Sequence, residues 1–124
     1  MRQWAGTSFS VADWRNNYSM YETTNGMKLM LSYNINSNDA QAYYEFVLSR
    51  YIPVMQSMGL ELSEAWHTAY GEYPNRLICF VCDDHETMVS VLENEVWDTL
   101  NDQLMEYVTE FSYKVIPYKL GFQI

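Results

Sequence analysis

Three side chains that could do acid-base or anion chemistry are spread along the sequence: His67, Arg76 and Tyr33. His67 lies between Trp66 and Thr68 in an aromatic segment, and a histidine can exchange a proton near neutral pH. Arg76 is one of only seven cations, and a guanidinium binds anionic ligand groups or carboxylates. A phenol such as Tyr33 can position a substrate through its hydroxyl group. These residues are the catalytic candidates, and their structural alternatives are a neighbour-bonded strand histidine, a surface ion pair and interface packing.

Aromatic side chains are in surplus. The chain has 11 Tyr, 5 Phe and 4 Trp in 124 residues, which is more aromatic surface than a small core can hide. We therefore expect a cavity or an interface to use the remainder. The residues that we expect to bind a ligand are Trp66, Tyr70, Tyr118 and Phe80.

Other chemical motifs are absent from the sequence. No G-x-x-x-x-G-K-[ST], G-x-G-x-x-G or G-x-S-x-G pattern occurs, which excludes the common nucleotide-binding and serine-hydrolase sites. Two histidines are too few for a His-rich metal site, so we expect neither metal nor cofactor. Cys79 and Cys82 have C-x-x-C spacing, but residues three apart in a strand point to opposite faces. Because no second pair completes a zinc site, we interpret both as buried free thiols in a reducing compartment.

The net charge of -9 argues against nucleic acid or an anionic membrane as a partner. Nine acids lie between Asp83 and Glu110, where there is no Lys or Arg. This pattern is typical of a solvated helix face, and a cation site is the alternative. The sequence shows neither an apolar leader nor a membrane-spanning run, so we expect a cytoplasmic protein.

The first half of the sequence predicts a strand followed by a helix. Residues 28–35 alternate in polarity, as in a strand with one buried face. A helix follows, with Asn38 as the predicted N-cap and Gly59 as the left-handed stop. Pro53 lies inside this helix and removes one backbone hydrogen bond, so a kink is predicted near Arg50.

The second half predicts a hairpin and a long helix. Residues 60–70 and 77–82 read as antiparallel strands joined by a five-residue turn. Asp84 caps the helix, which can break near Asn94, where a polar step interrupts the apolar pattern. The apolar stripe of this helix consists of Met88, Leu92, Val96, Leu100, Leu104, Val108 and Phe111.

A fourth strand over 113–122 completes the order β-α-β-β-α-β, and Pro117 requires an edge, a bulge or an early end to its pairing. Right-handed crossovers then predict an α+β, ferredoxin-like fold, in which a four-stranded antiparallel sheet has both helices on one face. This domain covers residues 27–124, and residues 1–26 form an N-terminal accessory arm. We expect a second copy of the chain to cover the open sheet face in a homodimer.

With this order of elements, the chain resembles the dimeric α/β barrel superfamily over residues 27–124, and NIPSNAP-like members most of all. Other members are the EthD-like proteins and the antibiotic-biosynthesis monooxygenases. The resemblance rests on KLMLSYNI, on YYEFVLSRYIPVMQSMGL, on Trp66 and Gly71, and on EVWDTL. It implies a ligand in or beside the barrel cleft. The resemblance also sets Asn34, Trp66 and His85 against residues of the haem-degrading members, but the local motifs of that group are absent.

Our leading hypothesis is a homodimer that binds a small apolar or aromatic molecule in the barrel cleft. The resemblance also implies an alternative, a cofactor-independent monooxygenase or isomerase acting on an aromatic or polyketide-like substrate. A purely structural or assembly protein is the third hypothesis. The sequence leaves open which face of strand 60–70 lines the cleft. The two alternatives are Glu64, Trp66, Thr68 and Tyr70, or Ala65, His67 and Ala69.

Overall fold

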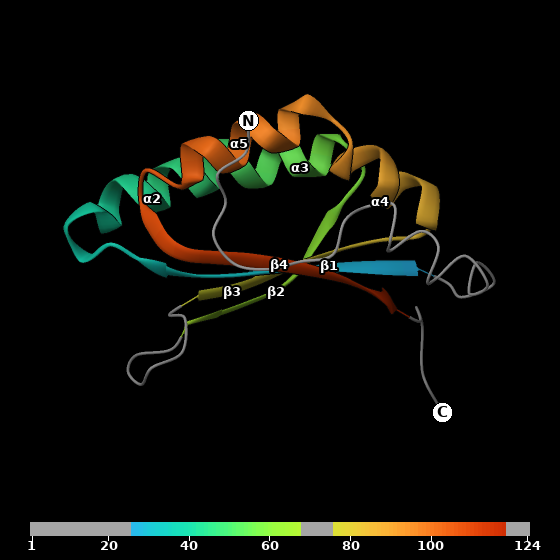
Figure 1. Cartoon of the computed structure of the whole chain (residues 1–124), viewed down its shortest axis with the longest axis horizontal. Helices are drawn as coiled ribbons and strands as arrows, with labels where there is room; N and C mark the ends of the chain where they lie inside the picture. The colour runs from blue at the N-terminus through green and yellow to red at the C-terminus, as the bar shows by residue number, and fades with distance from the viewer. Residues whose placement is uncertain (1–25, 68–75, 119–124) are drawn as a thin grey trace.

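The computed structural model describes residues 26–67 and 76–118, and in these ranges the chain forms two layers, a sheet and a set of helices on one of its faces (Figure 1). The sheet has four strands in the order β2-β3-β1-β4, and every neighbouring pair is antiparallel. The predicted ferredoxin-like α+β fold is therefore confirmed. The strands are β1 (Gly26–Ile35), β2 (Glu61–His67), β3 (Arg76–Cys82) and β4 (Val108–Tyr118).

The first helical run joins β1 to β2 and contains a π-helical turn. Pro53 has no N–H to donate, and just before it the N–H of Ile52 bonds to the carbonyl of Val47, five residues back. Near Arg50, where the sequence predicted a kink because of Pro53, the helix therefore contains a π turn. The segments are η2 (Ser37–Asp39), α2 (Ala40–Phe46), η3 (Val47–Tyr51) and α3 (Ile52–Ser57).

The sequence predicted the C-terminal end of this helical run correctly and its N-cap incorrectly. Gly59 has a φ of 108°, so the left-handed stop is confirmed. The predicted N-cap is wrong, because Asn38 lies inside the 3-10 turn η2 and Asp39 occupies the cap position without a side-chain hydrogen bond. The 3-10 turn satisfies the first backbone groups in place of a side chain.

The second helical run consists of α4 (His85–Leu92) and α5 (Glu95–Leu104). Asp84 caps α4 as predicted, since its Oδ1 accepts a hydrogen bond of 2.7 Å from the Thr87 N–H. The predicted break is also present, and there Asn94 Oδ1 accepts from the Val96 N–H at 2.8 Å. The second cap begins α5 with a different rotation about the helix axis from that of α4. Val96, which the sequence assigned to the apolar stripe, is therefore 41% exposed, and Trp97 is buried instead. No helix in the described ranges is long and apolar enough to cross a membrane.

Strand β4 begins five residues before the predicted start of the fourth strand. Val108 and Phe111 belong to this strand, so their assignment to the helix stripe is wrong. Val108 pairs with Ile35, and the register then shifts at a β-bulge where Glu110 has a φ of 56°. Val108 and Phe111 continue the helical spacing of the preceding residues, but the pairing of β4 with β1, which is distant in sequence, makes them part of a strand. Pro117 lies on an edge strand, as the sequence required.

The aromatic side chains fill the space between the sheet and the helices. In register, Leu29 faces Phe80 and Leu31 faces Ile78, and these pairs form the sheet's side of the core. Tyr33, Ile78 and Phe80 all lie on the helix-covered face, and each of the three is at most 1% exposed. The largest fully buried aromatic side chains are Trp97, Tyr33, Tyr43, Tyr51, Phe80 and Phe111.

Candidate functional site

The sheet places the three catalytic candidates in one row. His67 on β2 pairs with Arg76 on β3, and Arg76 pairs with Tyr33 on β1. Residues directly opposite one another on antiparallel strands project to the same face. Because Tyr33 contacts Tyr43 of α2, this is the face beneath the helices. The hairpin between β2 and β3 thus aligns residues that the sequence spacing could not relate.

The same pairing shows which side chains of β2 lie on each face of the sheet. Glu64 pairs with Cys79 and Trp66 with Leu77, on the face away from the helices. Ala65 and His67 are on the helix side. A register shift between Leu62 and Glu64 sets these faces, and no local pattern of residues predicted that shift.

Two consecutive tyrosines of α2 lie against this row. The Tyr43 hydroxyl is 2.6 Å from the Tyr33 hydroxyl, and the two rings meet edge to face. The Arg76 guanidinium lies over the Tyr44 ring, 5.6 Å from its centroid. Burial raises the pKa of Tyr43, whereas its hydrogen bond to Tyr33 and the charge and hydrogen bond of Arg76 lower it. Neither Tyr43 nor Tyr44 was a site candidate from sequence, where both read as part of a helix.

Burial fixes the protonation of the phenols. It raises the pKa of Tyr33 well above the ordinary 10.0, and the neighbouring Tyr43 raises it further. Burial likewise raises the pKa of Tyr51. At neutral pH these hydroxyls are therefore uncharged and cannot serve as bases.

A second buried polar pair lies between the two helical runs. Tyr51 in η3 donates a hydrogen bond of 2.6 Å from its hydroxyl to Oδ1 of Asn101 in α5. Asn101 is fully buried, and its Nδ2 has no hydrogen-bond partner among the described residues. The π turn positions Tyr51, and no spacing in the sequence relates it to Asn101.

An open hollow of about 840 Å³ runs along the outer flank of α2 and η3. Tyr44 and Leu48 give it an apolar wall, being 37% and 65% exposed. Because the Tyr44 ring also lies against Arg76, the hollow adjoins the row of candidates. The described lining residues are Gln41, Tyr44, Glu45, Leu48 and Ser49.

The residues expected to bind a ligand do not form one wall. Trp66 is 61% exposed on the open face of the sheet, whereas Phe80 is fully buried on the helix face. Tyr70 lies outside the described residues. The backbone of Tyr118 pairs with Gly26, but its side chain is outside the described part.

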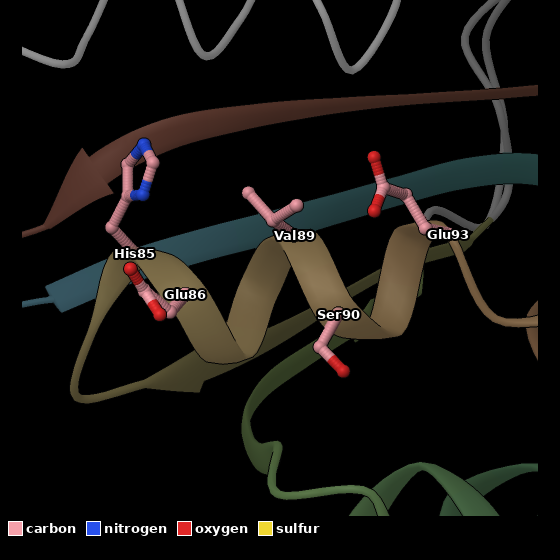
Figure 2. A pocket seen from close by; sticks show the side chains of 5 residues that line it. All are labelled: His85, Glu86, Val89, Ser90 and Glu93. Atoms are coloured by element: carbon pink, nitrogen blue, oxygen red, sulfur yellow. The ribbon is translucent and has the colours of Figure 1, made fainter.

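A smaller hollow of about 480 Å³ lies on α4 and is shown in Figure 2. His85, Val89 and Glu93 point to one side of the helix, and Ser90 points to another. His85 and Glu93 are eight residues apart, or about 12 Å along a helix, too far to share one metal ion. No cluster of three or more metal-ligating side chains occurs in the described ranges.

The two cysteines lie on opposite faces of the sheet, as the strand periodicity predicted. Cys79 pairs with Met30 on the open face and Cys82 with Met27 on the helix face. Both are free and buried, and burial raises the pKa of each thiol to about 11. They are therefore not nucleophiles at neutral pH.

The fold is similar to that of several solved structures. A NIPSNAP family protein of Agrobacterium tumefaciens aligns with a TM-score of 0.56 at 15% identity, over 78% of this chain and 89% of that chain. An uncharacterized NIPSNAP domain protein from Burkholderia xenovorans aligns with a TM-score of 0.57 at 11% identity, over 78% and 99%. A conserved protein from Bacteroides thetaiotaomicron, named a "possible oxidoreductase", has a TM-score of 0.58 at 9% identity, over 77% and 99%. No protein-family model and no curated protein matches the sequence. The chain therefore has a NIPSNAP-like fold.

Proposed function

We propose that this chain, which has a NIPSNAP-like fold, forms a homodimer in which each subunit binds a small apolar or aromatic molecule in the hollow on α2 and η3. The observation that carries the proposal is the apolar wall of Tyr44 and Leu48 beside the polar row of Arg76 and its neighbours. Small-molecule sites commonly combine an apolar lining with a few polar groups that fix orientation. The free thiols are consistent with a reducing compartment, so we also propose a cytoplasmic location.

The open face of the sheet supports the homodimer. All the described helices lie on the other face (Figure 1). Apolar side chains occupy open-face positions on every strand, between polar ones, and Trp66 is the most exposed of the large apolar residues there. A second copy packed on this face would remove them from water. The exposed or partly exposed apolar residues at these positions are Met30, Trp66, Leu77, Val81 and Ile116.

Ligand binding can be tested by thermal shift and native mass spectrometry against phenolic and polyketide-like compounds, with 2-naphthol as the first probe. Leu48→Glu places a charge in the apolar wall and should abolish the shift. Val96→Glu is the matched control, because Val96 is also partly exposed on a helix but lies outside the hollow. If no compound binds the wild type at micromolar concentration, or if Leu48→Glu binds as well as Val96→Glu, this site is wrong.

The second candidate function is a cofactor-independent oxidation or isomerisation of an aromatic substrate. His67 pairs with Arg76, and Arg76 lies beside the Tyr43 hydroxyl, which favours this function. The name of the Bacteroides protein with the same fold is consistent with an oxidation. In the oxidation, the phenolic substrate would supply the electrons that reduce oxygen.

Oxygen uptake with a phenolic substrate tests this second function. We expect uptake to be lost in His67→Ala while the circular dichroism spectrum is unchanged. Equal rates in the variant and the wild type would exclude His67 from the chemistry. A purely structural protein would neither consume oxygen nor bind any compound in the screen.

A further inference from the structure

Arg76 has no carboxylate partner among the described residues. Its guanidinium lies over the Tyr44 ring and beside the Tyr43 hydroxyl, and its Nε is buried without a hydrogen-bond partner in the described ranges. The sequence has 16 acids and 7 cations, so a cation without a carboxylate is unexpected. On the other face of the sheet, Lys28 has such a partner, with Nζ 3.5 Å from Oε1 of Glu64.

A partly buried guanidinium without an anion is unfavourable, because burial removes the water that would otherwise solvate it. The tyrosine hydroxyls beside it do not supply a negative charge. Tyr43 and Tyr33 are paired with each other, and each phenol is neutral at neutral pH. Among the described residues, the cluster therefore has donors in excess and lacks an acceptor with a negative charge.

The carboxylate of a ligand would match this cluster of donors in charge and geometry. The planar fork of an arginine offers two parallel N–H groups to the two oxygens of a carboxylate. The apolar hollow begins at Tyr44, the residue on which the guanidinium lies. Glu45 lines the same hollow, and its charge disfavours an anion on that side. A bound acid would thus direct its carboxylate toward Arg76 and its hydrocarbon part along Leu48.

We propose that Arg76 binds the carboxylate of an aromatic or other apolar acid whose hydrocarbon part occupies the hollow against Tyr44 and Leu48. This inference rests on the proposed ligand site and specifies its ligand class. His67 lies directly across from Arg76 on β2 and provides a further donor for the same group.

Isothermal titration with two matched probes tests the inference. 2-Naphthoate carries the carboxylate, and 2-naphthamide has the same rings without the charge. The wild type should bind 2-naphthoate more tightly, and added salt should weaken only that probe. Arg76→Gln should weaken 2-naphthoate about 10- to 100-fold, as expected for loss of hydrogen bonds to a charged group. Binding of 2-naphthamide should not change.

The matched control is Arg50→Gln, because Arg50 is exposed and donates from its Nε to Gln103 Oε1 at 3.1 Å. It should bind both probes as the wild type does. Arg76→Lys keeps the charge without the fork and should lose part of the affinity for 2-naphthoate, which provides a second variant if Arg76→Gln does not fold.

Three outcomes would overturn the inference. If wild-type protein binds the two probes equally, the carboxylate has no partner, while the proposed ligand site stands. If Arg76→Gln and Arg50→Gln bind 2-naphthoate equally, another cation holds it. If neither probe binds at millimolar concentration, both the inference and the proposed ligand site fail.

Discussion

Tyr51 and Asn101 depend on each other, because both are buried and the Tyr51 hydroxyl donates its hydrogen bond to Asn101 Oδ1. Asn101→Leu would leave the Tyr51 hydroxyl without its acceptor, and we expect it to lower the free energy of unfolding by about 1–3 kcal/mol. Adding Tyr51→Phe removes the stranded hydroxyl, so the double variant should recover part of that loss. Urea unfolding of the two single variants and the double variant measures the coupling. Strictly additive effects would mean that the hydroxyl finds another partner.

At the residue scale, the sequence identified His67, Arg76 and Tyr33 by chemical type. It could not place them together, because they lie on three strands and only the register aligns them. It missed Tyr43, whose hydroxyl reaches Tyr33 because of how α2 lies on the sheet. A helical tyrosine in a sequence rich in tyrosine carries no signal that separates it from the core.

The cap of α4 permits a prediction that depends on pH. The Thr87 N–H bonds to the Asp84 carboxylate and holds its pKa below the ordinary 3.8. A lowered folded-state pKa means that the stabilisation is present above pH 3.8 and is lost as the pH falls through the folded-state value. Asp84→Ala should therefore cost about 1 kcal/mol at pH 7, and the difference from wild type should shrink below pH 3.8.

Urea unfolding of both proteins at pH 7 and pH 3 measures this difference. Asp83→Ala is the matched control, because the neighbouring Asp83 is exposed and is not the cap residue. A cost for Asp84→Ala that stays constant over this range would contradict the role of the charged carboxylate.

The bulge in β4 places a glutamate in a left-handed conformation. Glu110 has a φ of 56°, a region that costs an L-residue about 1–2 kcal/mol. Glu110→Gly should raise the free energy of unfolding by up to about 1 kcal/mol, since glycine avoids that cost but has more entropy to lose. Thr109→Gly, one residue earlier in the strand, has no positive φ to relieve and should destabilise the protein. Thermal unfolding of both variants compares them, and equal effects would contradict the strain.

At the element scale, local signals in the sequence predicted the order of the strands and of the two helical runs. Pro53, Gly59 and Asp84 act through their own backbone or nearest turn, so their effects could be read directly. The start of β4 could not, because Val108 forms a strand only through pairing with Ile35, 73 residues earlier in the chain. Boundaries set by non-local pairing are invisible to periodicity.

The proposed homodimer leads to a prediction for the whole molecule. Trp66→Glu places a charge at the most exposed apolar position of the open sheet face, and a buried unpaired charge strongly opposes association. We expect wild-type protein to sediment as a dimer in analytical ultracentrifugation and Trp66→Glu as a monomer. Val96→Glu, on the helix layer, should remain a dimer. A monomeric wild type, or a dimeric Trp66→Glu, would exclude this face as the interface.

The sequence by itself determined the order of the elements, the Asp84 cap, the glycine stop and thus the ferredoxin-like fold. These features depend on short-range periodicity and on backbone restrictions at single residues. Only the tertiary structure decided which side chains share a site. The bulge in β2 sets the face on which His67 and Trp66 lie, and the packing of α2 brings Tyr43 and Tyr44 to Arg76. A shift of one residue in register exchanges the two faces of a strand, and local sequence does not fix that register.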